Sequence, residues 1–170
     1  DPNSGDLQPL LATEWSQTAP NQWTFKIRDG VTFSNGAPMT AEDAAYSIDR
    51  AVNSELNCNV DGYVFGDDPL EVATPDDSTL VVGTKSPDPI LPLRISFVEI
   101  VPTGTSMTEK VREPIGTGPY AIDGWEYGQK LFLKRNDTYW GEKPPFAKAE
   151  YQWRSEGSVR AAMITNDETD

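Results

Sequence analysis

The clearest pattern in the first half of the chain is a strict alternation of polar and apolar side chains over residues 22–28. A period of two is expected of a half-buried β-strand. The pairs Asp29-Gly30 and Asn35-Gly36 then favour tight turns, because glycine adopts left-handed backbone at little cost. We therefore predict a strand and hairpin over residues 22–36.

A helical pattern follows at residues 41–53. Thr40 can cap the first turn of this helix, with the carboxylate of Asp43 reaching back to form a capping box. The apolar positions fall at helical spacing on one face: Ala41, Ala45, Ile48 and Val52. The pattern predicts one helix with a single buried stripe. A strand is predicted over 78–84, whereas residues 54–70 show little periodicity.

The second half of the chain predicts a hairpin, a strand and a last helix. Two strand-like runs, 120–126 and 130–135, are joined by a turn at 126–129, and residues 149–153 alternate again. Ser155 can cap the last helix, whose inward positions would be Val159, Ala162 and Met163. Short strands with few helices indicate an α+β fold with mixed or antiparallel sheets.

Charge divides the chain into two parts. Residues 1–100 carry 16 acidic and 5 basic side chains, and residues 101–170 carry 11 and 9. Prolines and glycines interrupt the sequence between Pro102 and Pro114. We therefore expect two structural units, 1–102 and 103–170.

Composition excludes several classes of function. The chain of 170 residues has a net charge of −13, which disfavours a nucleic-acid partner. It has no histidine and one cysteine, so it lacks the residues of a Ser-His-Asp or Cys-His catalytic system and of a His/Cys zinc site. No apolar run approaches the ~20 residues of a membrane-spanning helix. We expect no catalytic residues, no cofactor and no metal, and we expect any signal segment to lie outside this chain.

Adjacent acidic residues leave one enzymatic alternative open. Glu42-Asp43, Asp67-Asp68 and Asp76-Asp77 could serve a secreted carboxylate-based hydrolase. Neighbouring residues on a helix point apart, however, so solvated surface and helix caps are the preferred interpretation. Tyr63 and Phe65 lie in the unpatterned loop, where aromatic side chains suggest ligand contact.

Several motifs occur in one order along the chain, and together they resemble a known family. They are Leu10–Trp15, Trp23–Gly36, Met39–Asp43 with Tyr46-Ser47 and Arg50, Val101-Pro102, Gly116–Tyr120, Trp125 with Gly128, Arg135–Trp140, and Arg160–Met163 with 166–170. This order resembles the peptide-type solute-binding proteins of ABC importers, which include the oligopeptide-, dipeptide- and nickel-binding proteins.

The resemblance implies a fragment of the first lobe of a type II periplasmic-binding-protein clamshell, with residues 1–102 as an extra subdomain and 103–170 as part of the main sheet. It implies Trp15, Trp23, Trp125 and Trp140 as scaffold positions. It also places Phe97 near the cleft, with core packing as the alternative. Together with Tyr63 and Phe65, Phe97 completes the expected ligand-binding residues.

The function implied by the resemblance is binding of a solute, oligopeptide or dipeptide, between two lobes and its delivery to an ABC permease. The location implied is extracytoplasmic, either periplasmic or as a surface lipoprotein. A sugar-oligomer-binding member of the family and the sensing domain of a regulator remain as alternatives.

Overall fold

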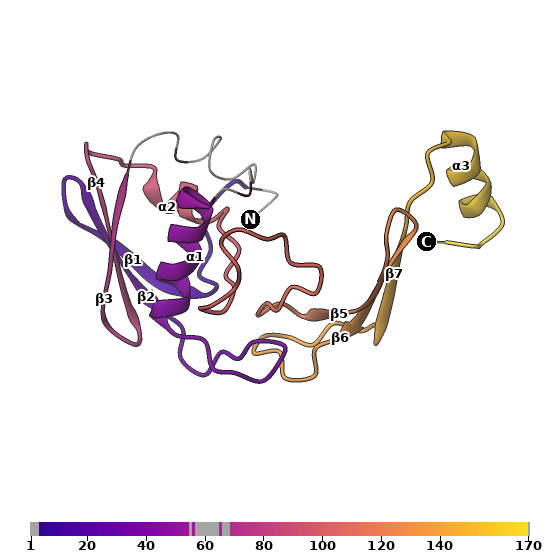
Figure 1. Ribbon diagram of the computed structural model, residues 1–170, viewed down its shortest axis with the longest axis horizontal. Helices are drawn as coiled ribbons and strands as arrows, with labels where there is room; N and C mark the ends of the chain where they lie inside the picture. The colour runs from indigo at the N-terminus through magenta and orange to yellow at the C-terminus, as the bar shows by residue number, and fades with distance from the viewer. Residues whose placement is uncertain (1–3, 55, 57–64, 66–68, 170) are drawn as a thin grey trace.

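The computed structural model describes residues 4–54, 56, 65 and 69–169, which form two antiparallel sheets with three helices (Figure 1). The first sheet has the strand order β1-β2-β4-β3 and the second the order β5-β6-β7. The strands of the first sheet are β1 (Ala12–Ala19), β2 (Gln22–Ile27), β3 (Leu70–Asp76) and β4 (Thr79–Thr84). Those of the second are β5 (Tyr120–Glu126), β6 (Lys130–Arg135) and β7 (Lys148–Gln152), and the helices are α1 (Ala41–Asn53), α2 (Leu91–Ile95) and α3 (Gly157–Thr165). The α+β fold with short antiparallel strands is thus confirmed.

The predicted hairpin at 22–36 is wrong in its pairing. The strand at 22–27 exists, but its neighbours are β1 and β4 rather than residues 31–36. Val31 and Phe33 are instead 1% exposed, and the segment forms only a single bridge, from Thr32 to Pro38. Two large apolar side chains are buried in this way, which stabilises the core more than an exposed hairpin would. Both predicted turns are present, with φ of 73° at Gly30 and 86° at Gly36.

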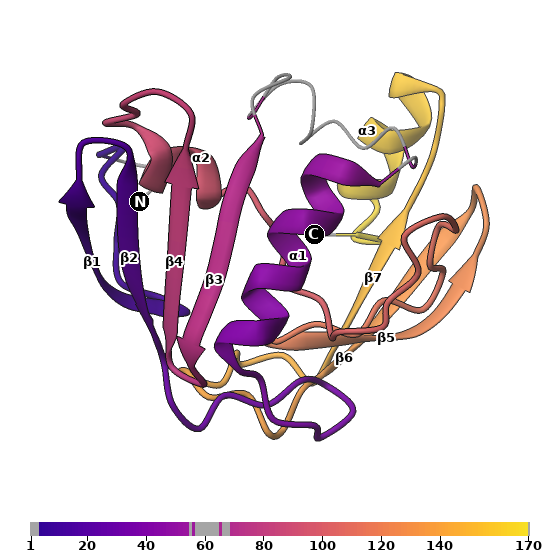
Figure 2. The ribbon, with the colours of Figure 1, turned by 60° about the vertical axis from the view of Figure 1, so that its left-hand side comes forward.

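Helix α1 matches its predicted bounds and covers one face of the first sheet, beside β3 and β4 (Figure 2). Its buried apolar residues are Ala41, Ala44 and Ile48, so the stripe is shifted slightly from the predicted one, with Ala45 and Val52 only partly buried. The capping box is confirmed, because the Thr40 amide donates to Asp43 Oδ2 at 2.9 Å. Together with apolar residues of β2 and β4, these side chains form the hydrophobic core.

The second sheet has one apolar face and one charged face. Trp125, Leu131 and Tyr151 are cross-strand neighbours and therefore lie on the same face. On the other face, Lys130 forms a 2.6 Å ion pair with Glu150. The predicted hairpin 120–135 is confirmed, with Gly128 at φ 75° in its turn.

Helix α3 differs from its prediction in its cap and in its packing. Its N-cap is Glu156 rather than Ser155, and none of its residues is buried. Val159 is 43% exposed rather than facing inward. The helix lies at the far end of the molecule from the first sheet (Figure 1), so the core that the described residues form beside that sheet does not bury the apolar positions of α3.

Candidate functional site

The three predicted ligand-binding residues lie in different environments. Phe65 is 4% exposed and packs in the hydrophobic core of the first sheet. Phe97, just after α2, is 58% exposed. Tyr63 lies outside the described residues. The described pair is therefore not gathered on one surface, and contact with a solute remains a prediction for all three residues.

An apolar cavity of about 220 Å³ lies beside Phe97. Ser96 and Val98, its chain neighbours, line the cavity together with Leu11 and Trp15. Buried core residues, including Ile48, form its inner wall. The volume is below the roughly 300–1,000 Å³ of sites for drug-sized ligands, so this cavity suits a single compact apolar group.

A second, more polar groove of about 490 Å³ lies between the first sheet's loops and β5. The five consecutive residues Ala121–Trp125 line it, so the groove follows the edge of β5 rather than one of its faces. Ser34 and Asn35 contribute from the other side, with residues 112–115. The arrangement brings together segments from both halves of the chain, which sequence patterns alone could not have paired.

Aromatic and charged side chains meet in this groove. The rings of Trp125 and Tyr127 are 5.3 Å apart, and the Arg112 guanidinium lies 4.6 Å from the centre of the Tyr127 ring. Such a surface can stack flat or cationic groups. Trp125, which the resemblance implies as a scaffold position, is 42% exposed, because it lies on an edge strand and on the apolar face of the second sheet.

The edge of β5 is protected against pairing with another strand. A register shift between Ile122 and Gly124 leaves Asp123 as an extra residue, and its carboxylate forms a 3.1 Å ion pair with Lys134. Bulges and charges are the features by which natural edge strands avoid pairing. The groove is thus better suited to a ligand held by side chains than to an added strand.

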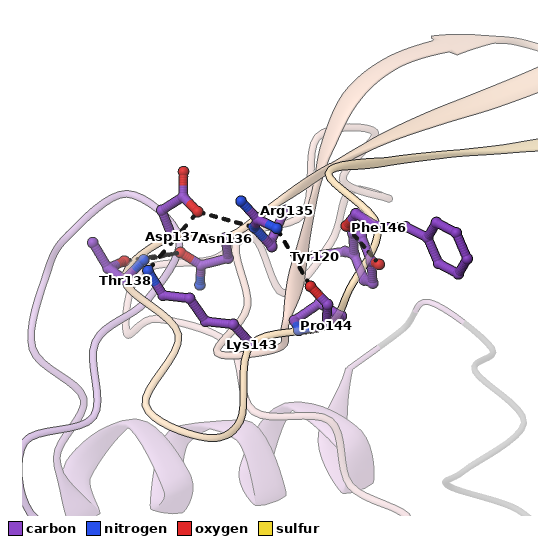
Figure 3. Close-up of polar contacts among 8 residues, drawn as sticks. All are labelled: Tyr120, Arg135, Asn136, Asp137, Thr138, Lys143, Pro144 and Phe146. Carbon is purple, nitrogen blue, oxygen red and sulfur yellow. Dashed lines mark hydrogen bonds and ion pairs between the residues drawn. The ribbon is translucent and has the colours of Figure 1, made fainter.

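The motif Arg135–Trp140 forms a tight polar turn (Figure 3). Asn136 is 6% exposed, and its side chain donates to the carbonyl of Gly118 at 3.1 Å and accepts from the hydroxyl of Thr138 at 2.8 Å. The Arg135 guanidinium reaches Asp137 at 3.0 Å. Asn136 and the Trp140 indole, which donates to the carbonyl of Thr117 at 3.2 Å, hold the segment Gly116–Tyr120 in place, so the motif is structural.

One carboxylate of each described acidic pair accepts hydrogen bonds within the fold. Asp43 is 6% exposed and accepts hydrogen bonds from Thr40 and Thr103. The pKa of the Asp76 carboxyl lies below its ordinary 3.8, because the hydroxyl of Thr79 and the amide and hydroxyl of Ser78 donate to it. These carboxylates stabilise a helix start and a turn. The pair Asp67-Asp68 lies outside the residues that the structure describes.

Neither a metal site nor a membrane span emerges from the described ranges. Within them no group of three or more acidic or cysteine side chains could hold a metal ion. Within the same ranges no helix has the length and apolar character needed to cross a bilayer.

Comparison with protein families identifies the scaffold. Residues 6–170 match the model of the bacterial extracellular solute-binding proteins, family 5. The chain belongs to this family.

Individual relatives agree with this assignment. The chain is 30% identical to the nickel-binding periplasmic protein of Escherichia coli, over 98% of its own length and 33% of that protein. It is 26% identical to the periplasmic oligopeptide-binding protein OppA of Salmonella typhimurium, covering 80% of this chain and 29% of that protein. The chain therefore spans about a third of the length of these curated relatives.

A solved structure gives the same result for the fold. The ABC transporter substrate-binding protein CtaP of Listeria monocytogenes superposes with a TM-score of 0.85 and 26% identity, covering 98% of this chain and 36% of that protein.

Proposed function

We propose that this chain forms part of the first lobe of an extracytoplasmic protein that captures an oligopeptide or dipeptide for an ABC permease. The observation that carries the proposal is the family match over residues 6–170. The peptide class is supported by the similarity to the oligopeptide-binding protein of Salmonella. Nickel complexes are the second solute class, supported by the similarity to the nickel-binding protein of E. coli.

Binding in this proposal requires both lobes. A solute enclosed between two lobes gains contacts from each, and closure selects the liganded conformation. The groove at β5 and the cavity beside Phe97 are the hollows from which this chain could contribute. Residues 1–170 alone should therefore fold but bind the solute weakly.

Calorimetry tests the proposal on the complete polypeptide that contains this segment. The probes are trialanine and the complex of nickel with L-histidine, each titrated also into residues 1–170 alone. We expect trialanine to bind the complete protein at least about 100-fold more tightly than residues 1–170, a difference of about 2.7 kcal/mol. Circular dichroism of the isolated chain confirms that it is folded.

Two outcomes would contradict the proposal. If only the nickel complex binds the complete protein, the peptide assignment is wrong. Micromolar binding of trialanine by residues 1–170 would show that one lobe suffices, which contradicts capture between two lobes.

A further inference from the structure

One face of α1 holds the connection that leads from the first sheet toward the second. Four side chains at helical spacing bind backbone groups of residues 101–106, which are called the connection here. The side chains are those of Asp43, Tyr46, Ser47 and Arg50. The opposite side of the helix packs on the first sheet, so α1 contacts both the first sheet and the connection.

Asp43 divides its carboxylate between the two sides. Its Oδ2 accepts from the amide of Thr40 at 2.9 Å, at the start of the helix. Its Oδ1 accepts from the amide and hydroxyl of Thr103, at 2.9 and 3.3 Å. The residue is 6% exposed, so water offers little replacement for these bonds. A carboxylate can serve both donors because it only accepts, whereas an amide in its place would turn an NH₂ group toward one of them.

Ser47 adds a second attachment one turn later. Its hydroxyl accepts from the amide of Val101 at 2.9 Å and donates to the carbonyl of Asp43 at 2.7 Å. The Tyr46 hydroxyl donates to the carbonyl of Thr105, and the Arg50 guanidinium to that of Ser106 at 2.9 Å. The connection is therefore held along its whole length.

A separate contact joins the two halves on another side. The Ser34 amide donates to the carbonyl of Gly116 at 2.9 Å, and the Arg28 guanidinium lies 4.7 Å from the centre of the Trp140 ring. Two separated points of attachment prevent rotation about either one. The groove beside β5 adjoins this second point of attachment, because Ser34 also lines the groove.

We propose that Asp43 and Ser47 are positioning residues that, by holding the connection, fix the orientation of unit 1–102 relative to unit 103–170. The two units then move as one body. Asp43 and Ser47 both belong to the motif Met39–Asp43 with Tyr46-Ser47 and Arg50, in which the sequence pattern indicates only the capping role of Asp43. The orientation of the units can be measured without a ligand. The proposed solute binding can therefore fail while the positioning role of Asp43 and Ser47 stands, and the positioning role can fail while solute binding stands.

Distance measurement between spin labels tests the assignment. The labels are placed at two exposed sites, Ala73→Cys on β3 and Lys148→Cys on β7, with Cys58→Ser to leave no other thiol. In residues 1–170 we expect one narrow distribution of distances. Asp43→Asn should broaden it at least about twofold, because the connection loses one of its attachments while the core is retained. Ser47→Ala, a milder change that retains the Asp43 bonds, should broaden it less.

Two control variants separate positioning from stability. Glu42→Gln removes an acidic charge from the same helical turn at an exposed site and should leave the distribution unchanged. Ile48→Val weakens the core on the helix face toward the sheet and should lower the unfolding midpoint without broadening the distribution. The assignment is overturned if Asp43→Asn and Ser47→Ala both keep the wild-type width, or if Ile48→Val broadens it as much as they do.

Discussion

The two sheets of this chain are held in place by different forces. Among the described residues, the buried apolar side chains of the first half are drawn from β2, β4, α1, the start of α2 and the segments between these elements, and the last of them in sequence is Leu91. The second sheet contributes none. Its large apolar residues are half-buried, as in β6, or exposed, as are Trp125 at 42% and Tyr151 at 59%.

The difference shows what each sheet needs in order to be stable. The first sheet buries its apolar face under α1 and so has its own core. A sheet with one uncovered apolar face gains little from hydrophobic burial and depends on its backbone pairing and on polar contacts. For the second sheet those contacts centre on Asn136 and on the ion pair of Lys130 with Glu150.

The largest expected effect compares the same substitution in both sheets. Leu80→Ala removes a side chain that is 2% exposed in β4 and should lower the free energy of unfolding by about 2–5 kcal/mol. Leu133→Ala, at a half-buried position in β6, should cost only about 1 kcal/mol. Urea unfolding followed by circular dichroism measures both values. Equal losses of unfolding free energy in the two variants would mean that Leu133 is packed as closely as Leu80, which contradicts the difference between the two sheets.

A smaller loss of stability is expected from a substitution that tests whether the stability of the second sheet depends on hydrogen bonds. Asn136→Ala leaves the carbonyl of Gly118 and the hydroxyl of Thr138 without their partner, at an expected cost of about 1–3 kcal/mol. The neighbouring Asp137→Ala, whose side chain is 71% exposed, serves as the control and should cost less than about 1 kcal/mol. If the two variants lose similar amounts of unfolding free energy, the stability of the second sheet does not depend on the hydrogen bonds of Asn136.

The smallest effect concerns the pH dependence of the first sheet. Because the pKa of Asp76 is lower in the folded protein than its ordinary 3.8, its carboxylate stabilises the fold above that pH. The stabilisation is lost as the pH falls through the folded-state pKa. Asp76→Asn should therefore flatten the decline in unfolding temperature below pH 3.8. The control is Asp77→Asn, which leaves the hydrogen bonds of Asp76 with Ser78 and Thr79 in place. An unchanged slope in Asp76→Asn would show that the turn at Ser78 and Thr79 does not depend on this charge.

Local elements were predicted well where neighbouring residues define them. The capping box at Thr40 and Asp43 defines the start of α1, and the turn at Gly128 joins two alternating runs into a hairpin. β1, β3 and α2 were missed. β1 and β3 are the outer strands of the first sheet and are largely exposed, so they lack a clear apolar alternation. α2 has only five residues, too few to show a period.

The candidate site was less predictable than the fold. The loop position of Phe65 suggested ligand contact, but the structure places this side chain in the core. The groove beside β5 was not anticipated, because its walls come from residues 34–35, 112–115 and 121–125. The signal available in the sequence was the aromatic pair Trp125 and Tyr127 at the start of the hairpin turn.

The sequence by itself determined the helix and hairpin bounds that short-range patterns define, the family resemblance and the exclusion of histidine-based chemistry. Only the tertiary structure decided that β2 pairs with β1 and β4, that the second sheet keeps an uncovered apolar face, and that Asp43 serves two segments at once. The reason is separation along the chain. The partner of Asp43 at Thr103 is 60 residues away, and no local pattern records a contact formed only when distant segments pack together.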